Sequence, residues 1–276
     1  MSGFLEQMAA TSAARVRRAK ASVAEATLLE RAQRTPAPPP LRLAADGFDL
    51  IAELKLRSPA AGALGAADAS MAAYVTAYAH AGAAAVSVLT EPTRFDGALT
   101  HLSDAARALA PHRVPAMRKD FLVDPYQVLE ARVAGAGGVL LILRMLSRET
   151  LGALIECARS QGLFVLLEAF DAADLERMHE VVAADAGRST LLAGVNCRDL
   201  ATLEVVPGRL LELAPLLPGG VPPVAESGVA GAEDARRLAA AGYRLLLVGS
   251  ALMRDQDPAG LARALIETGR AARRTS

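Results

Sequence analysis

Lysine is scarce in this chain, and two of its few copies stand where a proton donor could act. The sequence holds 30 Lys and Arg residues, and its lysines are Lys20, Lys55 and Lys119. Lys55 and Lys119 each come at the end of a short apolar run. An arginine stays charged near neutral pH, whereas a lysine ammonium can release its proton once burial or neighbouring charge has shifted its pKa. We therefore expect Lys55 and Lys119 to serve chemistry; the alternative is that rare lysines fall there by chance.

Acidic and amide side chains end other apolar runs. Glu53 precedes Lys55 by two residues, and Glu168 and Asn196 each end a later run. Any one of them could be an ordinary surface residue, but chance is a poor explanation for charged or amide side chains at the ends of several runs. Two lysines with carboxylates between them can form an acid–base set, because each charge shifts the pKa of the others. The four histidines fall outside these run ends, and we expect them at the surface.

The runs that carry these side chains have the spacing of a repeated strand–helix unit. Eight of them lack polar alternation, as strands do that are buried on both faces. In a (β/α)8 barrel such strands bring their carboxyl ends together to form the site. The expected strands are Phe48–Lys55, Ala84–Leu89, Val114–Lys119, Gly138–Leu143, Leu163–Glu168, Leu191–Asn196, Val221–Glu226 and Arg244–Gly249.

Helical stretches fill the gaps between these strands. Glycine closes several of the stretches just before the next strand, which is a common helix end. The chain is therefore predicted to be an α/β protein, a (β/α)8 TIM barrel. A doubly wound sheet is the alternative, but the glycine motifs of nucleotide-binding folds do not occur. The expected helices are Met71–Ala81, Pro125–Ala134, Arg148–Gln161, Asp171–Ala183, Arg209–Leu216, Ala232–Ala241 and Pro258–Thr268.

An additional helical segment precedes the barrel. Residues 4–33 are predicted to form a helix, and the proline-rich residues 35–40 a stiff linker. We divide the chain into an N-terminal extension and linker (1–41) and a catalytic barrel (42–276), together one structural domain. The basic run from Arg15 to Lys20 is expected to be a solvated face.

The composition narrows the possible partners and compartment. Net charge is zero and the pI is near 6.9, which argues against nucleic acid. Cys157 and Cys197 have no paired spacing, so neither a disulfide framework nor a zinc site is expected. No apolar run reaches the roughly 18 residues of a membrane span. We expect a cytoplasmic protein without a membrane partner, a monomer or at most a weak dimer.

Two loops have the small residues of a phosphate site. Ser227-Gly228 follows the seventh expected strand, and Gly249-Ser250 ends the eighth. Small residues let backbone N–H groups approach an anion, and barrels often hold phosphate between these two loops. Ser58 could help from the first loop. A plain turn would explain either of these Ser–Gly pairs equally well if it stood alone. The two pairs after adjacent strands together favour a phosphorylated ligand.

The chain resembles the indole-3-glycerol phosphate synthase family through almost its whole length. The resemblance is carried by the strings IAELK with Ser58-Pro59, SVLTEP, RKDFLVDPYQ, GVNCRDL, AESGV and VGSALM. RKDF-x-x-DPYQ is the most specific of these, whereas ESG and VGS also occur in other phosphate-binding barrels. The resemblance implies a cofactor-free carboxy-lyase of tryptophan biosynthesis. It would convert 1-(2-carboxyphenylamino)-1-deoxyribulose 5-phosphate into indole-3-glycerol phosphate.

The resemblance also implies roles for individual residues. Lys119 would be the general acid on the substrate ketone. Glu168 would stabilise the charged intermediate or move protons during dehydration. Lys55 would hold the anthranilate carboxylate or act as a second acid. Glu53 and Asn196 would orient the lysines and the sugar hydroxyls.

The predicted site has three parts. The catalytic residues are Glu53, Lys55, Lys119, Glu168, Asn196 and Ser227. The other substrate contacts are Phe95, Phe121 and Leu140, which would pack the aromatic ring, with Arg198 and Glu226. The phosphate would be held by Ser58, Gly228, Gly249 and Ser250. No metal ligand and no cofactor are predicted.

Two other functions remain open at this point. Another sugar-phosphate barrel, such as phosphoribosylanthranilate isomerase, would need an Asp/Cys acid–base pair, which this chain does not place at the ends of strands one and five. A catalytically silent paralogue could act as a binding partner within the pathway. The intact set of charged strand-end residues argues against that second alternative.

Overall fold

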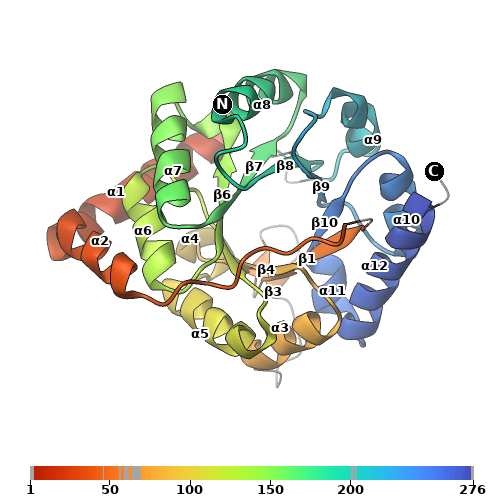
Figure 1. Cartoon of the computed structure of the whole chain (residues 1–276), viewed down its shortest axis with the longest axis horizontal. Helices are drawn as coiled ribbons and strands as arrows, with labels where there is room; N and C mark the ends of the chain where they lie inside the picture. Colours follow the sequence, from red (N-terminus) through yellow and green to blue (C-terminus); the bar gives the residue numbers. More distant parts are fainter. Residues whose placement is uncertain are drawn as a thin grey trace.

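Eight parallel strands close into a barrel, and helices surround it (Figure 1). The computed structural model describes residues 3–45, 47–55, 57–58, 62–63, 70–199, 202 and 204–274. Each strand pairs with its neighbours along the chain, and the last pairs with the first. The strands are β1 (Asp49–Leu54), β4 (Ala85–Leu89), β5 (Ala116–Lys119), β6 (Gly138–Ile142), β7 (Phe164–Ala169), β8 (Leu191–Asn196), β9 (Pro223–Glu226) and β10 (Leu245–Val248).

The predicted TIM barrel is confirmed. All eight expected runs contain a strand, with small shifts at the ends. Nearly every strand residue is buried, because one face fills the barrel and the other lies under the helices. The missing polar alternation in the sequence therefore has a direct structural cause.

The helices around the barrel follow the predicted pattern with one main exception. The helix α5 was not expected, although its buried residues Leu102, Ala105 and Leu109 have helical spacing. The helices are α3 (Met71–His80), α5 (Leu99–Leu109), α6 (Pro125–Val133), α7 (Arg148–Ser160), α8 (Ala172–Asp185), α9 (Arg209–Leu213), α10 (Ala232–Ala240) and α12 (Pro258–Arg274). Shorter elements are the helices α4 (Pro92–Phe95) and α11 (Ser250–Arg254), the 3-10 turns 110–112, 143–145 and 214–216, and the pair β2 (Arg57–Ser58) and β3 (Gly62–Ala63).

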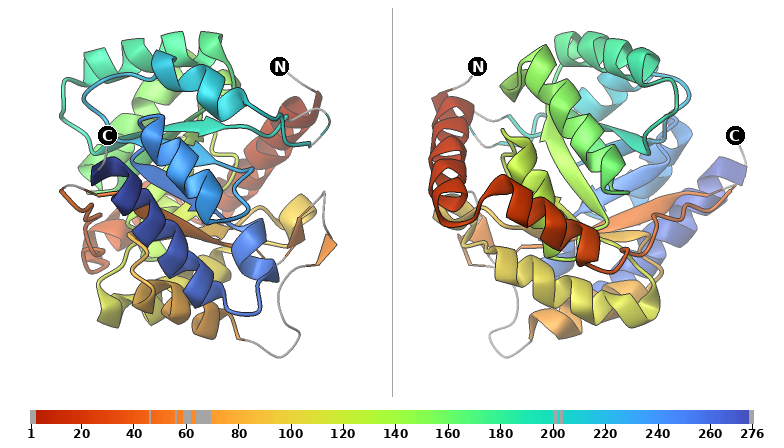
Figure 2. Two further views of the ribbon diagram at one scale, coloured as in Figure 1. Left: turned by 90° about the vertical axis from the view of Figure 1, so that its right-hand side faces the viewer. Right: turned by 60° about the vertical axis from the view of Figure 1, so that its left-hand side comes forward.

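The N-terminal segment forms two helices where one was predicted. Helix α1 (Gly3–Ser22) and helix α2 (Glu25–Arg34) meet at Ala24, which has an extended backbone. The Tyr126 hydroxyl lies 3.1 Å from the Ala19 carbonyl and 2.9 Å from the Val23 carbonyl. The hydroxyl thereby joins the end of α1 to α6, although the Ala19 carbonyl also accepts a hydrogen bond from the Val23 N–H at 2.9 Å. Both helices lie against the outside of the barrel (Figure 2).

The segment after α2 crosses the face of the barrel where the strands begin (Figure 1). Arg132 of α6 donates hydrogen bonds to the Thr35 and Pro36 carbonyls at 2.6 and 2.9 Å. Arg244, just before β10, donates to the carbonyls of Gly47 and Ala44. The opposite face, where the strands end, is left for the site.

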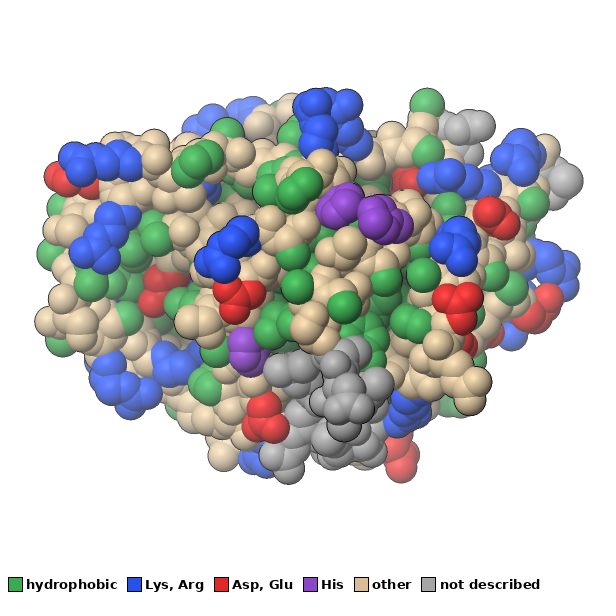
Figure 3. Space-filling model, turned by 90° about the horizontal axis from the view of Figure 1, so that it is seen from below, with side chains coloured by type: hydrophobic (Ala, Val, Ile, Leu, Met, Phe, Trp, Pro, Cys, Tyr) green, Lys and Arg blue, Asp and Glu red, His purple; other side chains and the backbone are tan. Residues whose placement is uncertain are grey.

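The surface charge and the length of the helices indicate which kinds of partner, nucleic acid or membrane, the described residues could contact. On the face shown in Figure 3, Lys and Arg side chains are interspersed with Asp and Glu, so the described residues form no broad basic field there. Among the described residues, no helix is long and apolar enough to cross a membrane.

Candidate active site

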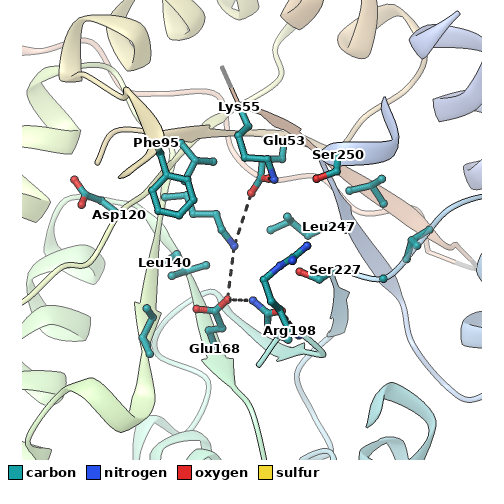
Figure 4. Close-up of a pocket in the computed structure, with 18 of the residues that line it drawn as sticks. Glu53, Lys55, Phe95, Asp120, Leu140, Glu168, Arg198, Ser227, Leu247 and Ser250 are labelled. Atoms are coloured by element: carbon teal, nitrogen blue, oxygen red, sulfur yellow. Dashed lines mark hydrogen bonds and ion pairs between the residues drawn. The ribbon is translucent and has the colours of Figure 1, made fainter. Parts of the chain in front are cut away.

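A cavity of about 1020 Å³, open mouth included, lies at the carboxyl ends of the barrel strands. It brings together most of the residues singled out in the sequence (Figure 4). Those that line it are Glu53, Lys55, Phe95, Lys119, Phe121, Leu140, Glu168, Asn196, Arg198, Ser227, Gly228, Gly249 and Ser250. Two predicted residues are not among its lining. Glu226 lies behind it, and the side chain of Ser58, in β2, falls outside the described part of the chain.

The centre of the site is the ammonium of Lys119, which three carboxylates surround. Its Nζ lies 3.1 Å from Glu226 Oε2, 3.6 Å from Glu168 Oε1 and 3.8 Å from Glu53 Oε2. These residues come from β5, β9, β7 and β1 and converge because their strands end on one face of the barrel. Burial alone would lower the pKa of Lys119, but the three carboxylates outweigh it and raise the pKa well above its ordinary value. The group is therefore a protonated ammonium at neutral pH.

Glu53 links the two lysines. Its Oε1 lies 2.9 Å from Lys55 Nζ, and its Oε2 faces Lys119. Burial would raise the pKa of Glu53, but Lys55 and Lys119 lower it overall. Gly249 makes room for this carboxylate, since a Cβ at that position would lie 2.3 Å from Glu53 Oε1. The glycine therefore serves the carboxylate as well as the loop after β10.

Glu226 is buried completely, behind Lys119 rather than at the cavity wall. Its Oε2 accepts a hydrogen bond from Lys119, while its Oε1 has no partner among the described residues. Burial raises the pKa of Glu226 above its usual range, although Lys119 draws it down. Gly194 leaves space for Oε1, because a Cβ there would lie only 2.3 Å away. From the sequence we expected Glu226 to contact the ligand directly. Its buried position behind Lys119 does not favour such a contact.

Glu168 and Asn196 form a second connected group. Asn196 Nδ2 donates to Glu168 Oε1 at 2.7 Å, and the backbone N–H of Arg198 donates to Asn196 Oδ1 at 2.9 Å. The Arg198 amide therefore fixes the amide of Asn196, which in turn orients the carboxylate facing Lys119. The guanidinium of Arg198 and the hydroxyl of Ser227 point toward the cavity (Figure 4).

One wall of the cavity is apolar. Phe95, Phe121 and Leu140 line it as expected. Phe4 of α1 also lines it and was not singled out in the sequence. Its ring packs edge-on against the Phe121 ring with 5.9 Å between the ring centres, and the centre of the Phe95 ring lies 6.4 Å from that of Phe121. An aromatic residue so far along the chain from the strand ends carries no local signal for such a position.

The two predicted phosphate loops lie next to each other across the cavity from this wall. Ser227 and Gly228 both have positive φ, at 67° and 71°. A side chain at Gly228 would also collide with Cys197, since its Cβ would lie 2.7 Å from Sγ. Gly249 precedes Ser250, the first residue of the short helix α11. Free N–H groups at such turns and helix starts can bind an anion.

Other expectations concern residues away from the cavity. Cys197 is buried, and burial raises the pKa of its thiol. The rings of His80 and His112 pack against each other with 4.6 Å between their centres. None of the four histidines lines the cavity. Among the described residues, no group of three His, Cys, Asp or Glu side chains is arranged to hold a metal ion. Asp120 lines the cavity and was missed in the sequence because it follows the strand end rather than occupying it.

Comparison with known proteins gives one consistent family. Residues 5–265 match a family profile described as indole-3-glycerol phosphate synthase. The enzyme of that name from Parafrankia sp. (strain EAN1pec) is 45% identical over 246 residues, covering 88% of each chain. The one from Mycolicibacterium vanbaalenii is 41% identical over 271 residues, covering 98% of this chain and 94% of the relative. The one from Nocardioides sp. is 43% identical over 258 residues, covering 94% and 91%.

Solved structures with low sequence identity share the fold. Thiamine phosphate pyrophosphorylase from Pyrococcus furiosus has a TM-score of 0.57 at 16% identity and covers 82% of this chain and 96% of its own. 3-Hexulose-6-phosphate synthase from Salmonella typhimurium has a TM-score of 0.60 at 16% identity and covers 82% of this chain and 100% of its own. At this level of identity the likeness extends to the barrel alone.

Proposed function

The chain belongs to the indole-3-glycerol phosphate synthase family, and on that premise we propose how its own residues carry out the reaction. The reaction closes the pyrrole ring of 1-(2-carboxyphenylamino)-1-deoxyribulose 5-phosphate and releases carbon dioxide and water. Its product is indole-3-glycerol phosphate, an intermediate of tryptophan biosynthesis. The observation that carries the assignment of roles is the Lys119 ammonium held among three carboxylates.

Lys119 is the general acid of the first step. The ring carbon that bears the carboxylate attacks the sugar ketone, and the ketone oxygen takes up a proton as the new carbon–carbon bond forms. The raised pKa of Lys119 keeps its proton in place until a basic alkoxide develops beside it. A positioned acid of this kind contributes about 10²–10⁴-fold to the rate.

The carboxylates and Lys55 serve the later steps. Carbon dioxide then leaves the ring carbon, and the bonding electrons return to the ring. The new hydroxyl departs as water, and a proton is lost from the neighbouring ring carbon, the former sugar C1 methylene, to form the double bond of the indole. Glu168, which faces Lys119 and is held by Asn196, is placed to accept that proton. Lys55 carries positive charge beside Glu53 and binds the anthranilate carboxylate or acts as the second acid.

The apolar wall and the small-residue loops bind the two ends of the substrate. Phe95, Phe121 and Leu140 pack the anthranilate ring, in surroundings that favour neutral carbon dioxide over a carboxylate. The loops at Gly228 and Ser250 hold the phosphate. In this arrangement Glu226 acts through Lys119, by holding its ammonium, rather than by touching the substrate.

Purified protein should form indole-3-glycerol phosphate without added metal or nucleotide, because acid–base side chains supply each step. Indole fluorescence after addition of the ribulose phosphate substrate measures this directly. A matched sample with a chelator should react at the same rate. Loss of activity with the chelator, restored by a divalent metal, would contradict the cofactor-free mechanism.

No product under any condition would favour a silent paralogue. A monomeric state and a cytoplasmic location stay predictions.

A further inference from the structure

The Asp120 carboxylate belongs to the site but does not face a ligand. Its residue lines the cavity, yet the carboxylate points away from the cavity centre (Figure 4). Asp120 immediately follows Lys119 and precedes Phe121, so it joins the proposed general acid to the apolar wall. Its own backbone neighbour, the Phe121 N–H, donates to Oδ1 at 2.8 Å. Whatever fixes this carboxylate therefore fixes the segment that carries both functional side chains.

Arginines from two elements fix Asp120. Arg118 Nη2 lies 3.1 Å from Oδ2, and the Thr90 hydroxyl donates to the same oxygen at 2.8 Å. Arg15 of α1 donates to both carboxylate oxygens, at 2.7 and 3.0 Å. Two parallel bonds from one guanidinium to one carboxylate combine charge with fixed geometry. Arg15 is thus separated from Asp120 by 105 residues in sequence, yet its guanidinium binds both oxygens of the carboxylate.

The same turn of α1 holds the next peptide. The Ser12 hydroxyl donates to the Phe121 carbonyl at 2.5 Å and accepts from Gln127 at 2.9 Å. About two turns further toward the N-terminus, Phe4 packs on the Phe121 ring. Helix α1 therefore contacts the carboxylate before Phe121, the carbonyl of Phe121 and its ring.

Arg15 differs in this respect from the arginines beside it. Arg17 and Arg18 are exposed and make no side-chain hydrogen bond or ion pair with another described residue. The Arg15 Nε, by contrast, is buried and has no hydrogen-bond partner among the described residues. Leaving a buried donor unpaired costs stability. A contact that carries such a cost suits a positioning role better than a purely stabilising one.

We propose that Arg15 is a positioning residue of the active site, which fixes Phe121 against the substrate ring through its two bonds to Asp120. This rests on the proposed function, in which Phe121 packs that ring. Lys119 keeps its three carboxylate contacts without Arg15, so the loss should fall on substrate binding more than on the chemical step. A change confined to KM is the kinetic sign of lost binding that is equal in ground and transition state.

The test compares Arg15→Met with Arg17→Met, a matched change on the same helix. In Arg15→Met, KM should rise about tenfold, the scale of one lost charge-assisted contact, with kcat changed by less than about threefold. Arg15→Lys should restore part of the loss, because it keeps the charge without the two-pronged geometry. Arg17→Met should behave as the unmodified protein. Asp120 retains Arg118 and Thr90 in each variant, and a melting curve verifies that each is folded.

A second measurement needs no turnover. Hydrogen exchange over residues 120–127 in the unliganded protein should be faster in Arg15→Met and unchanged in Arg17→Met. Unchanged KM and unchanged exchange in a folded Arg15→Met protein would overturn the proposal. Equal effects in the two methionine variants would overturn it as well, since both would then reflect the helix as a whole. If the unmodified protein forms no product, the proposed function fails, whereas the exchange measurement still decides the role of Arg15.

Discussion

The ammonium of Lys119 can be tested by a substitution that keeps its charge. Lys119→Arg replaces a compact donor with a larger group that holds its proton throughout the accessible pH range. We expect kcat to fall by about 10²–10⁴-fold, the usual contribution of a general acid. Substrate affinity should stay within about an order of magnitude, because the attraction for an anion survives. Steady-state kinetics by indole fluorescence measures both quantities.

Lys20→Arg is the control for this substitution. The sequence suggested an interchangeable exposed charge, but Lys20 pairs with Asp124 at 2.9 Å and Glu25 at 3.1 Å. Arginine can keep these half-exposed pairs, so kcat should not change, and any cost should appear only in the melting temperature. Near-normal turnover in Lys119→Arg would reduce that residue to an electrostatic role and shift the acid to Lys55.

At this scale the sequence predicted residue types at strand ends better than their directions. Lysine scarcity pointed to Lys55 and Lys119, and both line the cavity. The same reasoning could not distinguish Glu168, at the wall, from Glu226, buried behind it. Their difference depends on the register between neighbouring strands and on the space that Gly194 leaves beside Glu226 Oε1. Neither quantity is encoded locally in the chain.

The loops that follow β9 and β10 are the elements proposed to hold the phosphate. Ser250→Asp places a negative charge at the first residue of α11, where an anion would bind. KM should rise by about tenfold or more, the effect of one unfavourable charge contact in a partly buried site. Inorganic phosphate should compete with the substrate and raise the melting temperature of the unmodified protein, since it binds the folded state alone. The variant should lose that thermal shift.

Ser147→Asp makes the same charge change at a helix start outside the cavity. Ser147 caps α7 by accepting from the Thr150 N–H at 3.0 Å, and aspartate is an equally good cap. KM and the phosphate-induced thermal shift should therefore be unaffected. An unchanged KM in Ser250→Asp would remove the loop after β10 from the phosphate site.

Element boundaries followed from the sequence where burial decides them. The strands are mostly apolar because they are covered on both faces, and this made them visible as runs; polar residues such as Glu53, Glu168 and Asn196 stand near their carboxyl ends. The break between α1 and α2 was missed because no proline or glycine marks it. The Tyr126 hydroxyl, which contacts the Ala19 and Val23 carbonyls at this break, lies about a hundred residues further along the chain. Long-range partners of this kind leave no periodic signal.

Helix α1 packs into the barrel core and contacts the active-site segment, although from the sequence we placed it in an N-terminal extension ending at residue 41. Leu5 and Met8 are buried in the same core as the barrel strands. Val16 joins Leu28 and Tyr126 in a second cluster between the two N-terminal helices and α6. Arg15 and Ser12 reach the segment beside Lys119. The sequence predicted an additional helical segment. Its contacts with the active site became visible only in the packing of the folded chain.

The network around Asp120 should make the stability of the fold depend on pH in the acid range. Burial alone would raise the pKa of Asp120, but Arg118 and Arg15 outweigh it and lower the pKa from 3.8 to about 2. Because the folded-state pKa lies below the unfolded one, the ionised carboxylate stabilises the fold above about pH 4. That contribution is lost as the pH falls toward 2, and it amounts to about 2 kcal/mol.

Urea unfolding of Asp120→Asn beside the unmodified protein measures this contribution. The variant should be less stable at pH 7, and the difference in the free energy of unfolding should shrink between pH 4 and pH 2, where the natural carboxylate becomes protonated. Asp104→Asn is the control, because Asp104 forms an exposed pair with Arg107 on α5. Its effect should stay within about 0.5 kcal/mol at every pH. A difference for Asp120→Asn that stays constant down to pH 2 would mean that packing and neutral hydrogen bonds, and not the buried charge, join α1 to the active site.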